Sequence, residues 1–311
     1  MKRLFTGLQP SGALHLGNYF GALKPFLNLY QKYESFLCAV DYHALTTVRD
    51  PALLSRNTRD IIRDYVAAGV NPAQATIFKQ SDVPEHTELS WIFNSIVPMS
   101  LLELGHAFKD SAGKGKEGTV GLFTYPTLMA ADITLYDTDI VPVGEDQRQH
   151  VEYAREIARK FNTTFGDTLK EPQEHITKDV AVVPGTDGRK MSKSYGNTIP
   201  LFGTKDEIAK AVMSIVTDSN AESPVNVYAI HALLRDKTDL SVLYKENQGK
   251  YKALKEALIE DIEALVAPMR EVREMITDDD VKNILHEGGM KARAIAGKKM
   301  EDVRQKIGVT I

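Results

Sequence analysis

Short apolar runs alternate with amphipathic segments through the first half of the chain, and this alternation limits the possible folds more than any other feature of the sequence. Residues 3–8, 36–41 and 75–80 have the length and composition of buried strands, while residues 57–69 keep the apolar spacing of a helix. Strands that alternate with helices of this length form βαβ units and a parallel sheet. Because ligands of such sheets lie at the carboxyl ends of the strands, we expect the chemistry in the loops after the strands.

A further unit of this kind follows, in which the apolar run 139–144 precedes residues 145–161, whose apolar residues share one helical face. Beyond about residue 203 the strand patterns stop, and only helical spacing remains. We therefore expect an α/β fold. It consists of a Rossmann-like parallel-sheet domain over residues 1–202, with a helical insertion around residues 82–135, and an all-helical domain over residues 203–311.

Composition excludes several classes of protein. Of the 311 residues, 43% are hydrophobic and 26% are charged, as in soluble globular proteins. Lys and Arg total 38 against 42 Asp and Glu, a net charge of −4, which excludes nucleic-acid binding through bulk positive charge but not through a local basic patch. The single cysteine, Cys38, excludes a disulfide framework and a cysteine-rich metal site. No run reaches the roughly 18 apolar residues of a membrane span, so we expect a cytoplasmic chain without membrane contact.

One glycine pattern is a weak match to a nucleotide-binding motif. Gly113, Gly115 and Gly118 fit G-x-G-x-x-G, but no strand pattern precedes them and no helix pattern follows. We interpret this segment as a loop that contains glycine and lysine, and expect no dinucleotide site there.

The segment that follows the first strand, residues 9–19, is a better phosphate site. Gly12 and Gly17 allow the backbone to approach a ligand, and the start of the next helix offers free N–H groups to a phosphate. His15 can donate to a phosphate oxygen that develops negative charge. On this evidence alone, an ordinary turn with a surface histidine remains the alternative.

A second candidate phosphate site is the segment KMSKS, residues 190–194. Lys190 and Lys193 are three residues apart and can meet one polyphosphate, and the hydroxyls of Ser192 and Ser194 add donors. A charged loop by itself is usually solvated. Its occurrence together with the His15 segment in an α/β chain favours nucleotide binding.

A third candidate site surrounds Asp132, which lies in an apolar run. A helix that begins near residue 124, with Pro126 in its first turn, places four side chains on one face: Tyr125, Met129, Asp132 and Tyr136. A carboxylate among apolar neighbours is unfavourable unless a donor pairs with it. An exposed position on the outer face of the helix is the alternative. His43, at the end of a predicted strand, fits a ligand-binding or a hydrogen-bonded core position equally well.

These motifs resemble those of a known family. Residues 190–194 are identical to the KMSKS signature of class I aminoacyl-tRNA synthetases, and residues 15–18 resemble their HIGH signature, with Asn18 in place of the last histidine. Longer strings resemble the bacterial tryptophanyl-tRNA synthetase family along most of the chain: residues 6–12, 128–133, 141–147, 211–212 and 216–219. The chain departs from that family in a shorter segment before Lys190 and in the spacing of the loop that carries Lys109 and Lys114.

The resemblance implies a two-step reaction. ATP and L-tryptophan form tryptophanyl-adenylate and pyrophosphate, and tryptophan is then transferred to tRNA(Trp). Catalysis would consist of positioning and of charge stabilisation on the leaving pyrophosphate, with Mg²⁺ bridging phosphate oxygens and no resident metal. The resemblance also implies a homodimer and recognition of the tRNA anticodon by the helical domain.

The site residues follow from the same resemblance. The catalytic residues would be His15, Lys190 and Lys193. ATP would be bound by Gln9, Pro10, Ser11, Gly17, Asn18, Gly144, Glu145, Asp146, Val182, Val183, Lys190, Met191, Ser192, Lys193 and Ser194. Tryptophan would be bound by Asp132, Tyr125, Met129, Gln147 and His43.

Two segments are candidates for contact with partners. Residues 89–104 are apolar and helix-forming, so Trp91, Phe93 and Ile96 could lie in a dimer interface, although a single-domain core would also bury them. The last predicted helix has a local excess of cations, which fits a contact with tRNA or a solvated face: Lys291, Arg293, Lys298, Lys299, Arg304 and Lys306.

Three other functions remain open on the sequence alone. A tyrosyl-tRNA synthetase shares the expected fold and chemistry, although the strings 128–132 and 144–147 favour tryptophan. A nucleotidylyltransferase with a similar HIGH-type element would not need the long helical region after residue 203. An inactive paralogue that only binds or regulates would not need Lys190 and Lys193 together with Asp132.

Overall fold

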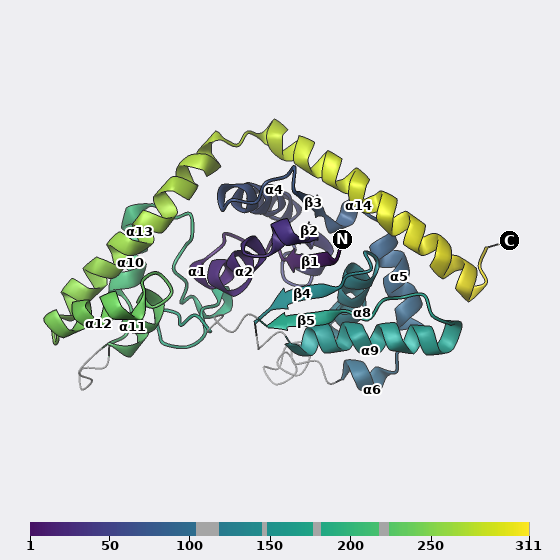
Figure 1. Ribbon diagram of the computed structural model, residues 1–311, viewed down its shortest axis with the longest axis horizontal. Helices are drawn as coiled ribbons and strands as arrows, with labels where there is room; N and C mark the ends of the chain where they lie inside the picture. The colour runs from purple at the N-terminus through teal and green to yellow at the C-terminus, as the bar shows by residue number, and fades with distance from the viewer. Residues whose placement is uncertain (104–117, 145–147, 177–181, 218–223, 311) are drawn as a thin grey trace.

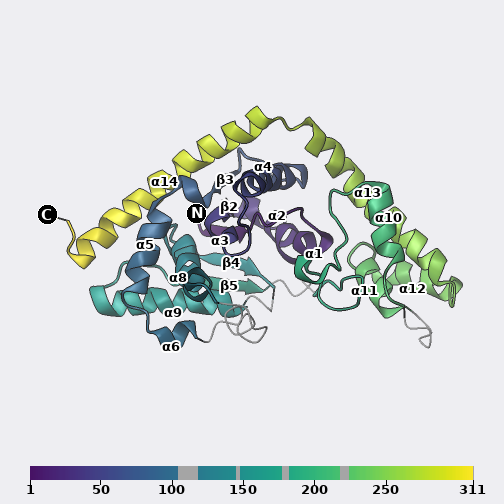
Figure 2. The ribbon, with the colours of Figure 1, turned by 180° about the vertical axis from the view of Figure 1, so that it is seen from behind.

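The computed structural model describes residues 1–103, 118–144, 148–176, 182–217 and 224–310. A central sheet lies beneath an arch formed by the last two long helices, and a group of shorter helices lies at one side (Figure 1, Figure 2). The predicted site residues Glu145, Asp146 and Gln147, and most of the glycine pattern that begins at Gly113, lie outside the described residues. Within the described part of the chain, no helix is long and apolar enough to cross a membrane.

Five parallel strands form one sheet in the described residues, in the order β3-β2-β1-β4-β5. They are β1 (Arg3–Leu8), β2 (Glu34–Ala39), β3 (Ala75–Lys79), β4 (Ile140–Val143) and β5 (Gln173–Ile176). The chain moves outward from β1 to β3 and then returns to the other side of β1 as β4. This doubly wound arrangement places ligands at the carboxyl ends of the strands, near the reversal between β1 and β4. The predicted Rossmann-like α/β fold is confirmed.

The pleat of the inner strands explains why the apolar runs predict them. Successive residues of a strand point to opposite faces, so a strand covered on both faces is apolar throughout. Leu4 and Leu37 belong to the core on one face, while Phe5 and Phe36 belong to the core on the other. Strand β5 was not predicted, because its four residues, QEHI, are short and mostly polar and lie at the edge of the sheet.

Helices cover both faces of the sheet. The helical elements of the first part of the chain are α1 (Leu16–Asn18), η1 (Tyr19–Leu23), α2 (Lys24–Leu27), η2 (Tyr30–Lys32), α3 (Asp41–Ala44), α4 (Pro51–Ala67), η3 (Gln80–Asp82), α5 (Glu85–Asn94), α6 (Met99–Leu102), α8 (Val120–Thr134) and α9 (Arg148–Phe165). Ile61 and Tyr65 of α4 pack into the core on the Leu4 face, and Phe93 of α5 and Phe161 of α9 pack on the other.

Three helix boundaries differ from the prediction. Helix α4 begins at Pro51 rather than near residue 57, because the Asp50 carboxylate caps its first N–H groups. Helix α8 begins at Val120 and is capped by Thr119, so Pro126 lies inside the helix and not in its first turn. Helix α9 is described from Arg148 and extends to Phe165, four residues beyond the predicted end.

After residue 203 the described chain is helical, as predicted. The elements are η5 (Lys193–Tyr195), just before that point, and then α10 (Lys205–Met213), α11 (Val225–His231), α12 (Lys237–Glu246), α13 (Tyr251–Met275) and α14 (Asp278–Ile307). Helices α10 to α13 gather at one side, whereas α14 crosses back over the sheet (Figure 1). The division into two domains near residue 203 stays a prediction.

Helix α14 lies against the edge strand β3 and against α5. Its approach to β3 depends on Gly288, because a Cβ atom at this position would collide with the backbone carbonyl of Ile77. Several of the cations that the sequence singled out pair with the first half of the chain: Arg293 with Glu85, Lys299 with Asp137 and Arg304 with Glu88. These three cations therefore fasten α14 and are not part of a free basic face.

We predict that Gly288→Ala destabilises the fold by about 1–3 kcal/mol, since α14 would have to shift away from β3. Gly297→Ala is the matched control, because it lies on the same helix and its Cβ would meet nothing closer than 4.0 Å. Removing a glycine from a helix interior there should stabilise by up to about 1 kcal/mol. Urea unfolding of both variants measures the difference, and equal stabilities would contradict this account of the packing.

Candidate active site

The loop after β1 and the lysine-rich loop meet although about 180 residues separate them. His15 and Pro200 form an antiparallel bridge, Leu16 N–H donates to the Ile199 carbonyl at 3.0 Å, and Leu201 N–H donates to the Leu14 carbonyl at 2.9 Å. Backbone hydrogen bonds thus hold together the two segments that the sequence singled out for phosphate binding.

Side chains complete this junction. The ammonium of Lys193 donates to the Gly12 carbonyl at 2.8 Å and lies 3.5 Å from the Ser11 hydroxyl. The N–H of Gly17 donates to the thioether sulfur of Met191 at 3.2 Å. A Cβ at Gly17 would press on the His15 ring and on Met191, so a larger residue would force the loops apart.

Electrostatics keep His15 neutral. Burial, and then repulsion from Lys193, lower the pKa of His15 from 6.5 to about 4. Burial also lowers the pKa of Lys193, although Asp64 opposes that shift. At pH 7 the imidazole is therefore an uncharged hydrogen-bond group beside an ammonium. Its Nδ1 is buried and has no hydrogen-bond partner among the described residues.

Asn197 holds the lysine-rich loop in shape, and sequence reasoning missed it. Its side-chain oxygen accepts from the N–H of Ser192 at 2.8 Å. Its amide nitrogen donates to Asp187 at 2.7 Å and to the Lys190 carbonyl at 3.1 Å. Asn197 is buried, and it fits only because Gly185 beside it has no side chain. A lone Asn three residues after the motif carries no signal that would have identified this role.

The other predicted ATP residues lie in different environments. Gln9 accepts the N–H of Ser11 in the turn after β1, and the Asn18 side chain accepts the N–H of His15 at 3.2 Å. Gly144 follows the end of β4. Of the remaining set, Pro10 and Val183 are buried, Val182 is exposed, and the hydroxyls of Ser192 and Ser194 lie 3.0 Å apart.

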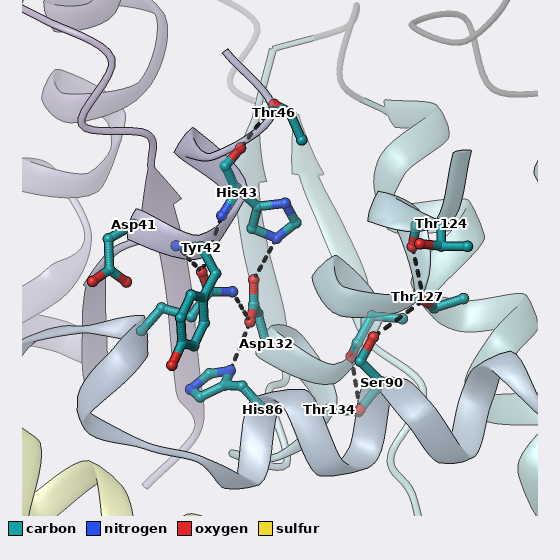
Figure 3. Close-up of polar contacts among 12 residues, drawn as sticks. Asp41, Tyr42, His43, Thr46, His86, Ser90, Thr124, Thr127, Asp132 and Thr134 are labelled. Carbon is teal, nitrogen blue, oxygen red and sulfur yellow. Dashed lines mark hydrogen bonds and ion pairs between the residues drawn. The ribbon is translucent and has the colours of Figure 1, made fainter. Parts of the chain in front are cut away.

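Asp132 lies in a buried hydrogen-bond network, with 2% of its surface exposed. One carboxylate oxygen, Oδ1, lies 2.7 Å from the amide nitrogen of Gln80 and 2.6 Å from Nδ1 of His86; the other, Oδ2, lies 2.9 Å from Nε2 of His43 (Figure 3). The alternative of an exposed Asp132 is therefore wrong. His43 touches the same carboxylate, so it belongs to this cluster.

Asp132 is ionised despite its burial. Burial by itself would raise the pKa of this carboxyl, but attraction to His86 and hydrogen bonds from His43 and His86 outweigh it and lower the pKa. An ionised carboxylate can only accept hydrogen bonds. Its three neighbours, Gln80, His86 and His43, must therefore all donate to it.

Gln80 and His86 were missed by the sequence analysis. Gln80 directly follows β3, at the carboxyl edge where functional groups were expected, and this position could have identified it. Its oxygen accepts the N–H groups of Tyr42 and His43, which turns its amide nitrogen toward Asp132. His86 lies on α5 and carries no local signal, because its partner is 46 residues away in sequence.

Tyr125 and Met129 border the same region. The Tyr125 ring meets His43 edge to face, with 6.4 Å between the ring centroids, and its hydroxyl lies 3.2 Å from Nε2 of His150. Met129 is half-buried and packs against the core on the Phe5 face of the sheet. Among the described residues, no group of three or more His, Cys, Asp or Glu side chains is arranged to hold a metal ion.

The structure combines a parallel sheet, two joined loops suited to phosphate binding and a buried hydrogen-bond acceptor, Asp132. This combination fits an enzyme that joins an amino acid to a nucleotide. The sequence model of the class I tRNA synthetases for tryptophan and tyrosine (W and Y) matches residues 1–294, and the chain belongs to this family. Full-length relatives are tryptophan–tRNA ligases. The one from Fusobacterium nucleatum is 46% identical and aligned over 99% of this chain and 98% of its own, and the one from Rhodopirellula baltica is 43% identical, with 99% of each chain covered.

Solved structures agree with this assignment. The tryptophanyl-tRNA synthetase of Campylobacter jejuni, complexed with ADP and tryptophan, is 42% identical and matches with a TM-score of 0.88 over 98% of this chain and 99% of that one. The tyrosyl-tRNA synthetase of Archaeoglobus fulgidus matches with a TM-score of 0.68 at 19% identity, which shows a shared fold alone.

We predict that Asn197→Ala lowers the rate of amino-acid activation about tenfold and leaves the KM for the amino acid within about twofold, because Lys190 and Ser192 lose the group that positions them. Amino-acid-dependent ATP–pyrophosphate exchange measures both quantities. Asn247→Ala is the control, since Asn247 lies at the end of α12 and its amide donates to the Leu243 carbonyl, away from the lysine-rich loop. A change in KM alone would contradict the positioning role.

Proposed function

We propose that this chain is a tryptophan–tRNA ligase, which activates L-tryptophan with ATP to tryptophanyl-adenylate and pyrophosphate and then transfers tryptophan to tRNA(Trp). Two observations support the proposal. Tryptophan–tRNA ligases match the chain from end to end at 38–46% identity, and a buried, ionised acceptor lies at the carboxyl edge of the sheet. These observations favour it over a tyrosyl enzyme, a nucleotidylyltransferase and an inactive paralogue.

In the proposed reaction the nucleotide lies between the two joined loops. Gly12 and Gly17 allow its phosphates to approach the backbone, and the ammonium groups of Lys190 and Lys193 offset the charge that develops on the leaving pyrophosphate. His15, uncharged at pH 7, donates or accepts a hydrogen bond there. Mg²⁺ would enter with ATP and bridge its phosphate oxygens, since Mg²⁺ is usually bound through substrate phosphates rather than by a protein cage.

On the amino-acid side of the site, the Asp132 carboxylate accepts a hydrogen bond from the indole N–H of tryptophan. A carboxylate has about four acceptor positions, and donors from Gln80, His86 and His43 use three of them. One position is left on Oδ2, which matches the single N–H donor of an indole. Phenylalanine has no donor and would leave that position unpaired in a buried site. Tyr125 and Gln147 would orient the ammonium of the substrate.

The experiment that tests this function is pyrophosphate exchange with tryptophan, tyrosine and phenylalanine, for wild type and two Asp132 variants. We expect exchange with tryptophan only in wild type, a moderate loss for Asp132→Asn, which keeps an acceptor, and a severe loss for Asp132→Ala. If Asp132→Ala retains the KM for tryptophan and the preference over phenylalanine, then this carboxylate does not recognise the indole.

We predict that Lys193→Ala lowers the single-turnover rate of adenylate formation by about 10²–10³, because the lost interaction is strongest in the transition state. The dissociation constant for tryptophan should stay nearly unchanged. Lys205→Ala is the control, since Lys205 pairs with Glu260 on the helical side. A purely tryptophan-binding defect in Lys193→Ala would contradict the assigned role.

We also propose a homodimer. Within the predicted interface segment, Trp91 is 72% and Met99 66% exposed, whereas Phe93 is fully buried in the core. The prediction that Phe93 contributes to an interface is therefore wrong. Trp91 also borders a groove that contains His43 and Tyr125 of the proposed amino-acid site and is lined largely by polar side chains, so the exposed Trp91 and Met99, and not this groove, support the dimer.

Trp91 is the single tryptophan of the chain, and so its fluorescence reports on this face alone. We predict that the emission shifts to shorter wavelength as protein concentration rises, and that Trp91→Lys sediments as a monomer. Met275→Lys, at another exposed apolar residue, should sediment as wild type. A wild-type monomer at micromolar concentration would refute the dimer.

We propose that tRNA contacts the helical part of the chain after residue 203. Since Arg293, Lys299 and Arg304 are engaged in ion pairs, α14 offers fewer cations to tRNA than its sequence indicates. The proposed reaction and its substrates support the proposal that the protein acts in the cytoplasm.

A further inference from the structure

We propose that His86 and Tyr136 are specificity-positioning residues, which hold the Asp132 carboxylate as a fixed, acceptor-only group with its one remaining acceptor position directed at the substrate. The inference rests on the proposed recognition of the indole by Asp132. Neither residue touches the substrate in this account, because both act through Asp132.

Hydrogen bonds connect three buried side chains in a row: Tyr136, His86 and Asp132. Tyr136 Oη lies 2.8 Å from Nε2 of His86, and Nδ1 of His86 lies 2.6 Å from Oδ1 of Asp132. The side chains of His86 and Tyr136 are completely buried. Gln80 bonds to the same Oδ1, so two donors on one oxygen hold the carboxylate against rotation.

Aromatic packing keeps Tyr136 in place. Its ring stacks on Phe36 and Phe5, with centroid separations of 4.7 and 5.7 Å, and meets Phe78 edge to face at 5.6 Å. These residues come from β1, β2 and β3, three neighbouring strands of the sheet. The packing against the sheet therefore presents the hydroxyl to His86.

The direction of the hydrogen bonds follows from the charge on Asp132. Since the carboxylate only accepts, Nδ1 of His86 must carry a proton. Burial raises the pKa of Tyr136 well above its ordinary value, and Cys38, Asp132 and Glu85 add to the shift, so the phenol keeps its proton. The hydrogen bond between the Tyr136 hydroxyl and Nε2 then fixes the orientation of the His86 ring, whose Nδ1 faces Asp132.

Loss of the hydrogen bonds that run from Tyr136 through His86 would change the hydrogen-bonding capacity of the Asp132 carboxylate. Without His86, one of the three donors is gone, and burial then favours the protonated carboxyl, which is a donor as well as an acceptor. A protonated or rotated carboxyl no longer presents a unique acceptor to an indole N–H. The defect should therefore appear in the recognition of that N–H and not in the chemical step.

The test compares tryptophan with β-(benzothiophen-3-yl)alanine, in which sulfur replaces the indole N–H. Pyrophosphate exchange gives kcat/KM for each substrate, and their ratio isolates the N–H. We expect His86→Leu to lower this ratio at least about tenfold through the KM for tryptophan, with kcat little changed. His86→Asn, which retains a donor near Nδ1, should restore most of the ratio, and Tyr136→Phe should lower it about threefold.

The chain contains a matched control. His231 on α11 is also fully buried, and lies 2.6 Å from an Asp261 oxygen and 3.3 Å from the Tyr244 hydroxyl. The same three residue types meet here, with the roles of the two ring nitrogens exchanged relative to His86. His231→Leu should leave the substrate ratio unchanged, whatever it does to stability.

The outcomes distinguish a failure of the proposed indole recognition by Asp132 from a failure of the positioning role of His86 and Tyr136. If wild type does not distinguish the two substrates, Asp132 does not read the N–H, and the proposed role of Asp132 fails together with this inference. If wild type distinguishes them and His86→Leu does so equally well, or loses activity equally on both, only the positioning role fails. Should His86→Leu not fold, an unchanged ratio in Tyr136→Phe overturns the inference.

Discussion

The amino-acid side of the site is organised around one buried anion, the carboxylate of Asp132, which needs hydrogen-bond donors. Asp132 is 2% exposed, and a carboxylate in such a place remains ionised only if donors surround it. The donors come from three separate elements: His43 from α3, Gln80 from η3 and His86 from α5. The carboxyl ends of β2 and β3 and the helix that follows must therefore converge on the last turn of α8. The network connects the sheet to the helices beside it and points the unused acceptor position toward the ligand edge.

The nucleotide side of the site has the opposite charge, because it presents cations and backbone groups and not a carboxylate. Backbone hydrogen bonds between two loops that are distant in sequence give this side its shape. Lys193 contacts the Gly12 carbonyl, a contact that a phosphate could replace with a stronger one. Asn197 holds the backbone of the lysine-rich loop through Ser192 and the Lys190 carbonyl, so the shape of the loop does not depend on the lysine ammonium groups alone. The buried carboxylate suits an apolar amino acid with one N–H donor, and the lysine-rich loop suits a polyanionic nucleotide.

Patterns local in sequence predicted what depends on local physics. The alternation of apolar runs predicted the parallel sheet and its carboxyl edge, and the apolar surroundings of Asp132 predicted a carboxylate in need of partners. The partners themselves, Gln80 and His86, are long-range, and no periodicity marks them. The cations of α14 were misleading for the same reason, since their carboxylate partners Glu85 and Glu88 lie on α5, more than 200 residues earlier in the chain.

The most direct test of the account is a crystal structure of the protein with L-tryptophan bound. We expect the indole nitrogen within about 2.7–3.2 Å of Asp132 Oδ2, while Gln80 and His86 keep their hydrogen bonds to Oδ1 and His43 keeps its bond to Oδ2. An indole nitrogen bonded to another group, or a carboxylate that has turned away from His86 to reach the ligand, would contradict it.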